Sequence, residues 1–123
     1  MQGRTVLITG ATDGIGRETA KALARQGAAL IIHGRNPGRC DAVRRDILRD
    51  HPRTNVEIEI ADLSSLAEVR SLAGRVRTRF PSLHVLMNNA GVYMTQRVLS
   101  ADGVEMTFAV NHLSHFLLTL LLL

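Results

Sequence analysis

The amino-acid sequence predicts an α/β fold, in which a parallel sheet is wound with helices on both of its faces. Short apolar runs alternate with amphipathic stretches along the whole chain, and such alternation is typical of strands joined by helices. The apolar runs are continuous, which indicates strands buried on both faces. We expect a doubly wound sheet of Rossmann type, because right-handed crossovers give the strand order 3-2-1-4.

Each element is placed by its own local signals. Gly27 closes the first helix, Pro37 lies just before the second and Pro81 follows the third, as is usual at helix ends. Asp102, with Glu105 three residues later, predicts a capping pair for the last helix. The predicted strands are 4–9, 28–33, 55–60 and 83–88, and the predicted helices are 15–26, 38–50, 65–79 and 102–121.

Composition indicates one soluble globular domain. Hydrophobic residues make up 46% of the chain and charged residues 21%, with a formal charge of +4. The arginines fall mostly on two predicted helices and aromatic residues are only 3%, so we expect no nucleic-acid partner. Cys40 has no second cysteine to pair with, and no apolar leader is visible; both favour a cytoplasmic protein.

Two other partners are weighed and set aside. The longest apolar stretch, 116–123, is shorter than the roughly 20 residues that span a bilayer, so we expect a packed helix there and no membrane span. His112 and His115 have a spacing on a helix that could hold a metal, but no carboxylate or cysteine joins them after Glu105. We therefore predict no metal site.

A glycine turn follows the first strand and is the clearest functional signal. It joins the apolar run at 6–8 to a helix that starts near Arg17, so the N–H groups and the positive end of the helix dipole point at one spot. We predict that it binds the diphosphate of a nucleotide; the alternative is an ordinary tight turn. The predicted binding residues in the turn are Gly10, Thr12, Asp13, Gly14, Ile15 and Gly16.

The end of the second strand indicates which cofactor binds. A carboxylate at this point would hold the two ribose hydroxyls of NAD, but the sequence has Gly34, followed by Arg35. The Arg35 guanidinium can pair with a 2′-phosphate, and Arg17 could reach the same group. The sequence therefore favours NADP over NAD; alternatively, Arg35 is one more surface arginine.

The third and fourth strands also end in candidate binding residues. Asp62 can accept a hydrogen bond from an adenine amino group while Leu63 packs on the ring, although Asp62 could instead cap the helix that follows. After the fourth strand, Ala90 and Gly91 are small enough for the backbone to approach a ribose, and the asparagine pair that ends in Asn89 can brace neighbouring strands. The alternative for this run is a bare turn.

Four motifs together resemble the short-chain dehydrogenase/reductase family. They are the turn at 9–16, the pair at 62–63, the run Asn-Asn-Ala-Gly at 88–91 and the segment Val-Asn-His-Leu-Ser-His-Phe at 110–116. The last segment, with Arg17 and Arg35, is similar to the retinol-dehydrogenase-like branch, which generally prefers NADP. The resemblance implies hydride transfer between a nicotinamide and the carbon of a small-molecule alcohol or carbonyl substrate.

The resemblance also implies a catalytic serine, tyrosine, lysine and asparagine, of which only the asparagine is carried over, as Asn111. No Tyr-x-x-x-Lys pair exists in the chain, because its only lysine is Lys21. Tyr93 stands four residues before Arg97 but directly after the fourth-strand turn, and is interpreted as a loop residue.

We therefore interpret residues 1–123 as a dinucleotide-binding domain truncated within the Asn111 helix, and expect the chain alone to be inactive. The alternative is a non-catalytic NADP-binding module or a decaying short form. The resemblance also suggests a homo-oligomer through the 102–123 helix.

Overall fold

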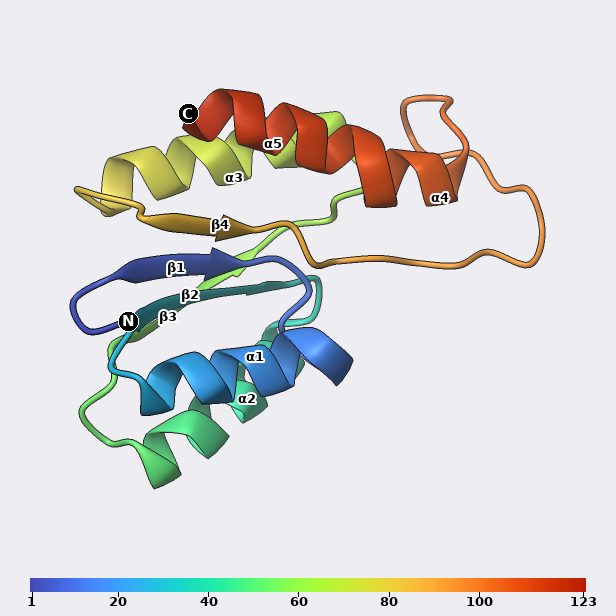
Figure 1. Ribbon diagram of the computed structural model, residues 1–123. Helices are drawn as coiled ribbons and strands as arrows, with labels where there is room; N and C mark the ends of the chain where they lie inside the picture. The colour runs from blue at the N-terminus through green and yellow to red at the C-terminus, as the bar shows by residue number, and fades with distance from the viewer. The chain divides into compact units, whose positions relative to one another are not determined.

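The computed structural model describes residues 1–123 and divides into two compact units. The first unit contains Met1–Ile60 and Ser82–Asn89, and the second contains Ala61–Pro81 and Ala90–Leu123. Each is described in turn, with elements labelled as in Figure 1.

The first unit is built on a parallel four-stranded sheet. Its strand order is β3-β2-β1-β4, so the predicted order is confirmed (Figure 1). In the central strand, Leu7 is paired with Ile31 on one side and with Leu86 on the other. The strands are β1 (Thr5–Ile8), β2 (Ala29–Gly34), β3 (Val56–Ile60) and β4 (Val85–Met87).

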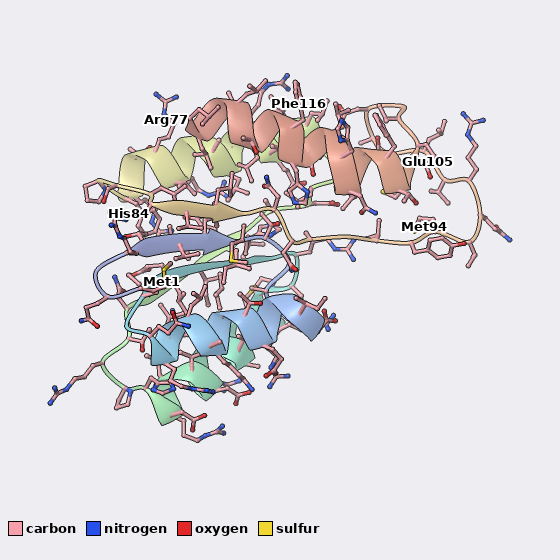
Figure 2. The ribbon with its side chains drawn as sticks, in the orientation of Figure 1. Met1, Arg77, His84, Met94, Glu105 and Phe116 are labelled. Carbon is pink, nitrogen blue, oxygen red and sulfur yellow. The ribbon has the colours of Figure 1, made fainter.

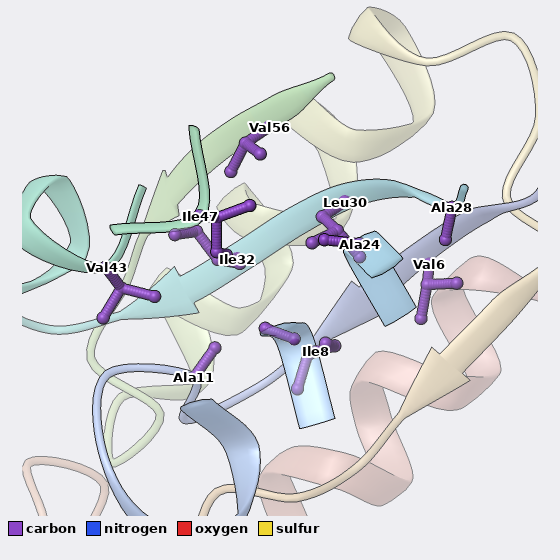
Figure 3. Close-up of a cluster of buried hydrophobic side chains, with 11 residues drawn as sticks. Val6, Ile8, Ala11, Ala24, Ala28, Leu30, Ile32, Val43, Ile47 and Val56 are labelled. Carbon is purple, nitrogen blue, oxygen red and sulfur yellow. The ribbon is translucent and has the colours of Figure 1, made fainter. Parts of the chain in front are cut away.

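Helices α1 (Gly14–Arg25) and α2 (Pro37–Asp50) pack on one face of this sheet. Alternate strand residues face them, and the small side chains of Ala20 and Ala24 of α1 allow a close approach of helix to sheet; Figure 3 shows Ala24 among the buried side chains of this core. Burial of each large aliphatic side chain contributes about 1.5–3 kcal/mol. The main members of this core are Val6, Ile8, Leu30, Ile32, Ala20, Ala24, Val43 and Ile47.

The ends of these helices follow the predicted signals. Gly27 lies just after α1 with φ of 82°, a left-handed conformation that favours glycine. Pro37 is the first residue of α2, where a missing N–H costs nothing, and Asn36 caps the helix. The backbone of the first unit is therefore fixed largely by local sequence.

The second unit contains α3 (Leu66–Arg79), which packs against α5 (Ser114–Leu122). Val69, Leu72 and Val76 of α3 are buried, as is Leu118 of α5. Directly before α5, the chain forms the short helix α4 (Met106–Phe108) and then the π-helical segment η1 (Ala109–Leu113). None of the helices combines the length and the apolar character that a membrane crossing needs.

The predicted start of the last helix is wrong. The helical segment begins at Met106, and Glu105, labelled in Figure 2, is its N-cap. The Glu105 carboxylate accepts a hydrogen bond of 2.6 Å from the Phe108 N–H. Asp102 lies in the preceding turn, and its Oδ2 accepts a 2.9 Å hydrogen bond from the Leu66 N–H, the first N–H group of α3. The carboxylate that was expected to cap its own helix therefore binds an N–H group of a different one.

Candidate functional site

The glycine turn between β1 and α1 depends on backbone conformations that other residues rarely adopt. Gly10 has φ of 64° and Gly14 has φ of 52°. A side chain at either position would strain the backbone. These two glycines bend the chain out of the sheet and directly into α1.

Gly16 is required for a different reason, which is space. A Cβ atom at this position would lie 2.3 Å from the Gly10 carbonyl oxygen and 2.5 Å from Asn89 Nδ2. Both distances are shorter than any ordinary contact, and the first is to backbone. The first turn of α1 therefore packs directly on the strand end that precedes it.

The N-terminus of α1 is not capped by its own sequence. Asp13 occupies the N-cap position, but its side chain accepts no hydrogen bond from the helix. The first helical bond runs from the Arg17 N–H to the Asp13 carbonyl at 3.1 Å, so the N–H groups of Gly14, Ile15 and Gly16 have no intrahelical acceptor. Together with the helix dipole, these groups can bind an anion.

The Asp13 carboxylate is held by a neighbouring helix instead. Its Oδ2 forms an ion pair of 3.0 Å with the guanidinium of Arg39, in the first turn of α2. A carboxylate near the start of α1 would repel a bound anion. The ion pair offsets that charge, although both side chains are exposed and the pair is screened by solvent.

Asn89 braces the turn from β4, as predicted for the asparagine pair. Its Nδ2 donates to the carbonyl oxygens of Thr9 at 3.0 Å and of Gly10 at 3.1 Å. Its backbone N–H donates to Thr9 Oγ1 at 3.0 Å. Both carbonyl groups at the entrance of the turn are thereby fixed to the end of β4.

His33 braces the same turn from β2, and the sequence interpretation missed it. The imidazole is 2% exposed, and its Nδ1 accepts a 3.2 Å hydrogen bond from the Gly10 N–H. The His33 carbonyl accepts a second one, of 2.9 Å, from the Ala11 N–H. A histidine inside an apolar strand gives no local signal of such a partner, because the contact depends on strand pairing.

Gly34, at the end of β2, has no room for a side chain. A Cβ there would lie 2.7 Å from Thr12 Cγ2 and 2.7 Å from Cys40 Sγ. Burial raises the pKa of the Cys40 thiol, so at neutral pH this group stays uncharged and packs as a small apolar side chain. The absence of a carboxylate at this position thus has a packing reason.

The two arginines that were predicted to bind a 2′-phosphate differ in their surroundings. Arg35 is exposed immediately after β2, and the structure shows no ion pair to it. Arg17 is paired with Asp46 of α2 at 2.5 Å, and its Nε is buried without a hydrogen-bond partner. Of the two side chains, Arg35 is the one available to an incoming anion.

The remaining predicted residues lie in the second unit. The Asp62 carboxylate is used locally, since its Oδ1 accepts hydrogen bonds from the Ser64 N–H at 2.9 Å and from Ser64 Oγ at 2.7 Å. The cap of α3 is Ser65, whose side chain accepts from the Glu68 N–H. Leu63 is buried, with 3% of its surface exposed.

Asn111 holds the segment that follows β4. Its Oδ1 accepts a 2.7 Å hydrogen bond from the Val92 N–H, and its Nδ2 donates to the Val92 carbonyl at 2.8 Å. Gly91 lies beside it, with space for an ordinary contact. Ala90, directly before Gly91, is half-buried. The candidate catalytic residue is thus tied to the run that was predicted to approach a ribose.

The π-helical segment around Asn111 frees carbonyl groups that side chains then satisfy. Ser114 Oγ donates to the Val110 carbonyl at 2.6 Å, and His115 Nδ1 lies 3.3 Å from the Asn111 carbonyl. Burial lowers the pKa of His115. The structure places no group of three His, Cys, Asp or Glu side chains where a metal ion could be held.

Comparison with known proteins identifies relatives along nearly the whole chain. The sequence model of a family described as short chain dehydrogenase matches residues 4–123. Human retinol dehydrogenase 13 is 42% identical over 98% of this chain and 37% of its own length. Mouse retinol dehydrogenase 12 is 44% identical over 98% of this chain and 38% of its own length.

A solved structure agrees with this match. The short-chain dehydrogenase from Sphingobium yanoikuyae, determined in complex with NADPH, superposes with a TM-score of 0.83 and 30% identity. The alignment covers 97% of this chain and 46% of that one. The chain thus spans about two fifths of the length of these curated relatives.

Proposed function

Because the chain belongs to the short-chain dehydrogenase/reductase family, we propose that it binds NADP(H) as the cofactor-binding part of an alcohol or carbonyl oxidoreductase. The observation that carries this proposal is the uncapped N-terminus of α1 beneath the glycine turn. Three backbone N–H groups converge there without an internal acceptor, and Ile15 at the same point is 80% exposed. This is the chemistry that a diphosphate needs.

The preference for NADP rests on charge at the end of β2. Arg35 would pair with the 2′-phosphate, and Gly34 leaves no carboxylate to repel it. Arg17 would contribute only after its guanidinium is shared with or released from Asp46. The solved relative that carries NADPH supports this choice of cofactor.

Cofactor contacts are also proposed for residues of the second unit. Asp62 would accept from the adenine amino group through an oxygen that Ser64 leaves open, and Leu63 would provide apolar contact. Ala90 and Gly91 would lie against a ribose. Asn111, already tied to the chain after Gly91, is the proposed catalytic residue and would position a water that carries a proton.

The reaction is an oxidation of a CH–OH group or its reverse. When bound, the nicotinamide would accept the hydride that the alcohol carbon loses, and the hydroxyl proton would pass to a base. The chain offers no tyrosine and lysine spaced for this proton transfer, which typically contributes ~10²–10⁴-fold in rate. We therefore expect the 123-residue chain to show no measurable turnover with NADPH and a panel of aldehydes and ketones.

The second candidate is a binding module that holds NADP without catalysis. Both candidates bind the cofactor, and neither is expected to turn over in the 123-residue chain. The coding sequence downstream separates them, because an in-frame continuation with a serine and Tyr-x-x-x-Lys would support the part of an enzyme, and a stop codon would support the module. Turnover by the chain alone in steady-state NADPH oxidation would contradict the expected inactivity.

Cofactor binding is tested by calorimetric titration of the chain with NADPH and with NADH. We expect NADPH to bind more tightly, and Arg35→Gln to weaken NADPH by about tenfold, the worth of one charge-assisted hydrogen bond. The affinity for NADH should not change in this variant. Arg53→Gln, which removes an exposed arginine in the turn after α2, is the matched control and should change neither affinity.

Two results would contradict the proposal. Tighter binding of NADH than of NADPH at low salt would overturn the cofactor preference. Binding of neither cofactor would overturn the function and leave only the family and the fold.

Self-association through residues 102–123 stays a prediction. Phe108, Phe116 and Leu120 are each more than half exposed along this segment, and exposed apolar patches of this kind mark contact surfaces. Sedimentation of the chain should show oligomers, and Phe116→Glu should shift them toward monomer; a wild-type chain that sediments as a single monomer would contradict this.

A further inference from the structure

The buried imidazole of His33 lies against the glycine turn and not within the apolar core. Its Nδ1 is the acceptor for the Gly10 N–H, and Gly10 is the first residue of the glycine turn with positive φ. The next N–H, that of Ala11, donates to the His33 carbonyl. The end of β2 therefore takes up both N–H groups at the entrance of the turn.

The opposite side of the turn is held in the complementary way. Asn89, which follows β4, donates to the carbonyls of Thr9 and Gly10, whereas β2 accepts from the N–H groups of Gly10 and Ala11. The peptide groups of Gly10 have little freedom left. The later N–H groups of Gly14 to Gly16 have no acceptor within the helix and stay available to a ligand.

We propose that His33 is a positioning residue for the cofactor, in that its Nδ1 acceptor fixes Gly10 and so preorganises the N–H groups of α1 for the diphosphate. This inference rests on the proposed function. Nδ1 can accept this hydrogen bond only when it carries no proton, so the proton of the imidazole lies on Nε2. If the turn already has its bound conformation, less of the binding free energy is lost to ordering the turn when the cofactor binds.

Variants of matched size test the acceptor separately from burial. In His33→Asn, Oδ1 occupies the place of Nδ1 and can accept from the Gly10 N–H. In His33→Leu a methyl group stands there, and in His33→Gln the polar group lies one atom further from the backbone. Ile47→Val is the control, because it removes one methyl group from the core between α2 and the sheet and does not change the glycine turn.

The dissociation constant for NADPH is measured with the free energy of unfolding of each variant in urea. We expect His33→Leu and His33→Gln to raise the dissociation constant by about tenfold, the effect of one lost hydrogen bond. His33→Asn should stay within about threefold of wild type by the same reasoning. Ile47→Val should lower stability without changing the dissociation constant.

A direct readout is the hydrogen exchange of the Gly10 amide, followed by NMR in glycine-labelled protein. It should be protected in wild type and in His33→Asn, and exchange faster in His33→Gln and His33→Leu. Wild-type affinity in His33→Leu and His33→Gln, or equal losses in all three His33 variants, would overturn the inference. If the wild-type chain binds no nicotinamide cofactor, the proposed function fails, and the inference is then decided by Gly10 protection alone.

Discussion

Helices α1 and α2 begin at equivalent places, each directly after a strand of the same sheet, but their N-termini have opposite chemistry. In α2, Asn36 Oδ1 accepts from the Arg39 N–H at 3.1 Å, and Pro37 at the first position has no N–H to satisfy. In α1, the N-cap residue Asp13 makes no such bond. A side-chain cap is worth about 1 kcal/mol, so α1 forgoes stability that α2 has.

The difference is the basis of the proposed anion-binding role of α1. A helix that satisfies its own first N–H groups cannot offer them to an anion, whereas α1 leaves them open. Helix α2 also contributes to the start of α1. Arg39 of α2, whose N–H is capped by Asn36, forms an ion pair through its guanidinium with the Asp13 carboxylate. The predictions that follow alter one N-terminus and use the other as the reference.

The largest effect is expected from adding one methyl group to each helix start. Gly16→Ala places a Cβ 2.3 Å from the Gly10 carbonyl oxygen, and such overpacking costs about 1–3 kcal/mol. In α2, Gly38→Ala meets only Asn36 Oδ1 at 3.3 Å, and alanine favours the helix by ~1 kcal/mol.

Urea unfolding should therefore show a large loss of stability in Gly16→Ala and little or no loss in Gly38→Ala. NADPH affinity should fall only in the first variant. If the two variants unfold at the same urea concentration, the tight packing around Gly16 does not contribute to stability.

The next effect concerns the caps themselves. Asn36→Ala removes a cap that is in use and should lower the free energy of unfolding by about 1 kcal/mol, without weakening NADPH. Asp13→Ala removes a side chain that caps nothing and should leave stability almost unchanged. The comparison fails if the two variants are destabilised equally in urea.

A smaller effect is expected on cofactor affinity from the charge of Asp13. Asp13→Ala removes a carboxylate near the open end of α1 and frees Arg39, so NADPH should bind a few-fold more tightly at low salt. The gain should vanish near 1 M salt, where charges are screened beyond about 3 Å. Arg39→Gln should shift the affinity in the opposite direction; a gain that persists at high salt would exclude an electrostatic cause.

The smallest effect is expected at α4, whose closed N-terminus depends on a carboxylate. The hydrogen bond from the Phe108 N–H lowers the pKa of Glu105 below the usual 4.5. The stabilisation is therefore complete above pH 4.5 and is lost as the pH falls through the folded-state value.

Glu105→Gln keeps an acceptor but cannot titrate. Its stability at neutral pH should be close to wild type, and its loss of stability below pH 4.5 should be shallower. Identical pH profiles in urea unfolding would rule out this cap as an acid-sensitive contact.

Local signals in the sequence predicted what local chemistry decides. Strand order, the closure of α1 by Gly27 and a bracing role for Asn89 are found in the structure. The glycine depends on local backbone conformation, and the strand order follows from the alternation of strands and helices with right-handed crossovers. The contacts of Asn89 with Thr9 and Gly10 join distant segments, but they lie where two neighbouring parallel strands end. The binding roles of the turn and of Arg35 stay predictions.

Contacts between distant segments could not be predicted in the same way. Asp102 and Glu105 look like a capping pair, but Asp102 accepts a hydrogen bond from the Leu66 N–H at the start of α3, 36 residues away in sequence. The role of His33 depends on which strand lies beside it, and Arg17 is engaged by Asp46 of a separate helix. In each case the type of side chain indicated a polar contact, but the sequence did not indicate which residue it contacts.

The π-helical segment around Asn111 gives the chain a place where one residue can be lost without changing the helix that follows. A π turn holds one residue more than an α turn, so deleting one residue from 109–113 would leave a regular helix with satisfied backbone hydrogen bonds. Because the wide turn contains the extra residue, the helix after the deletion would keep nearly the same face toward α3, and Leu118 would stay buried. What would be lost is the wide turn itself, where Ser114 Oγ donates to the Val110 carbonyl and His115 Nδ1 lies near the Asn111 carbonyl. The surroundings of the candidate catalytic residue can thus be altered separately from the packing of α5.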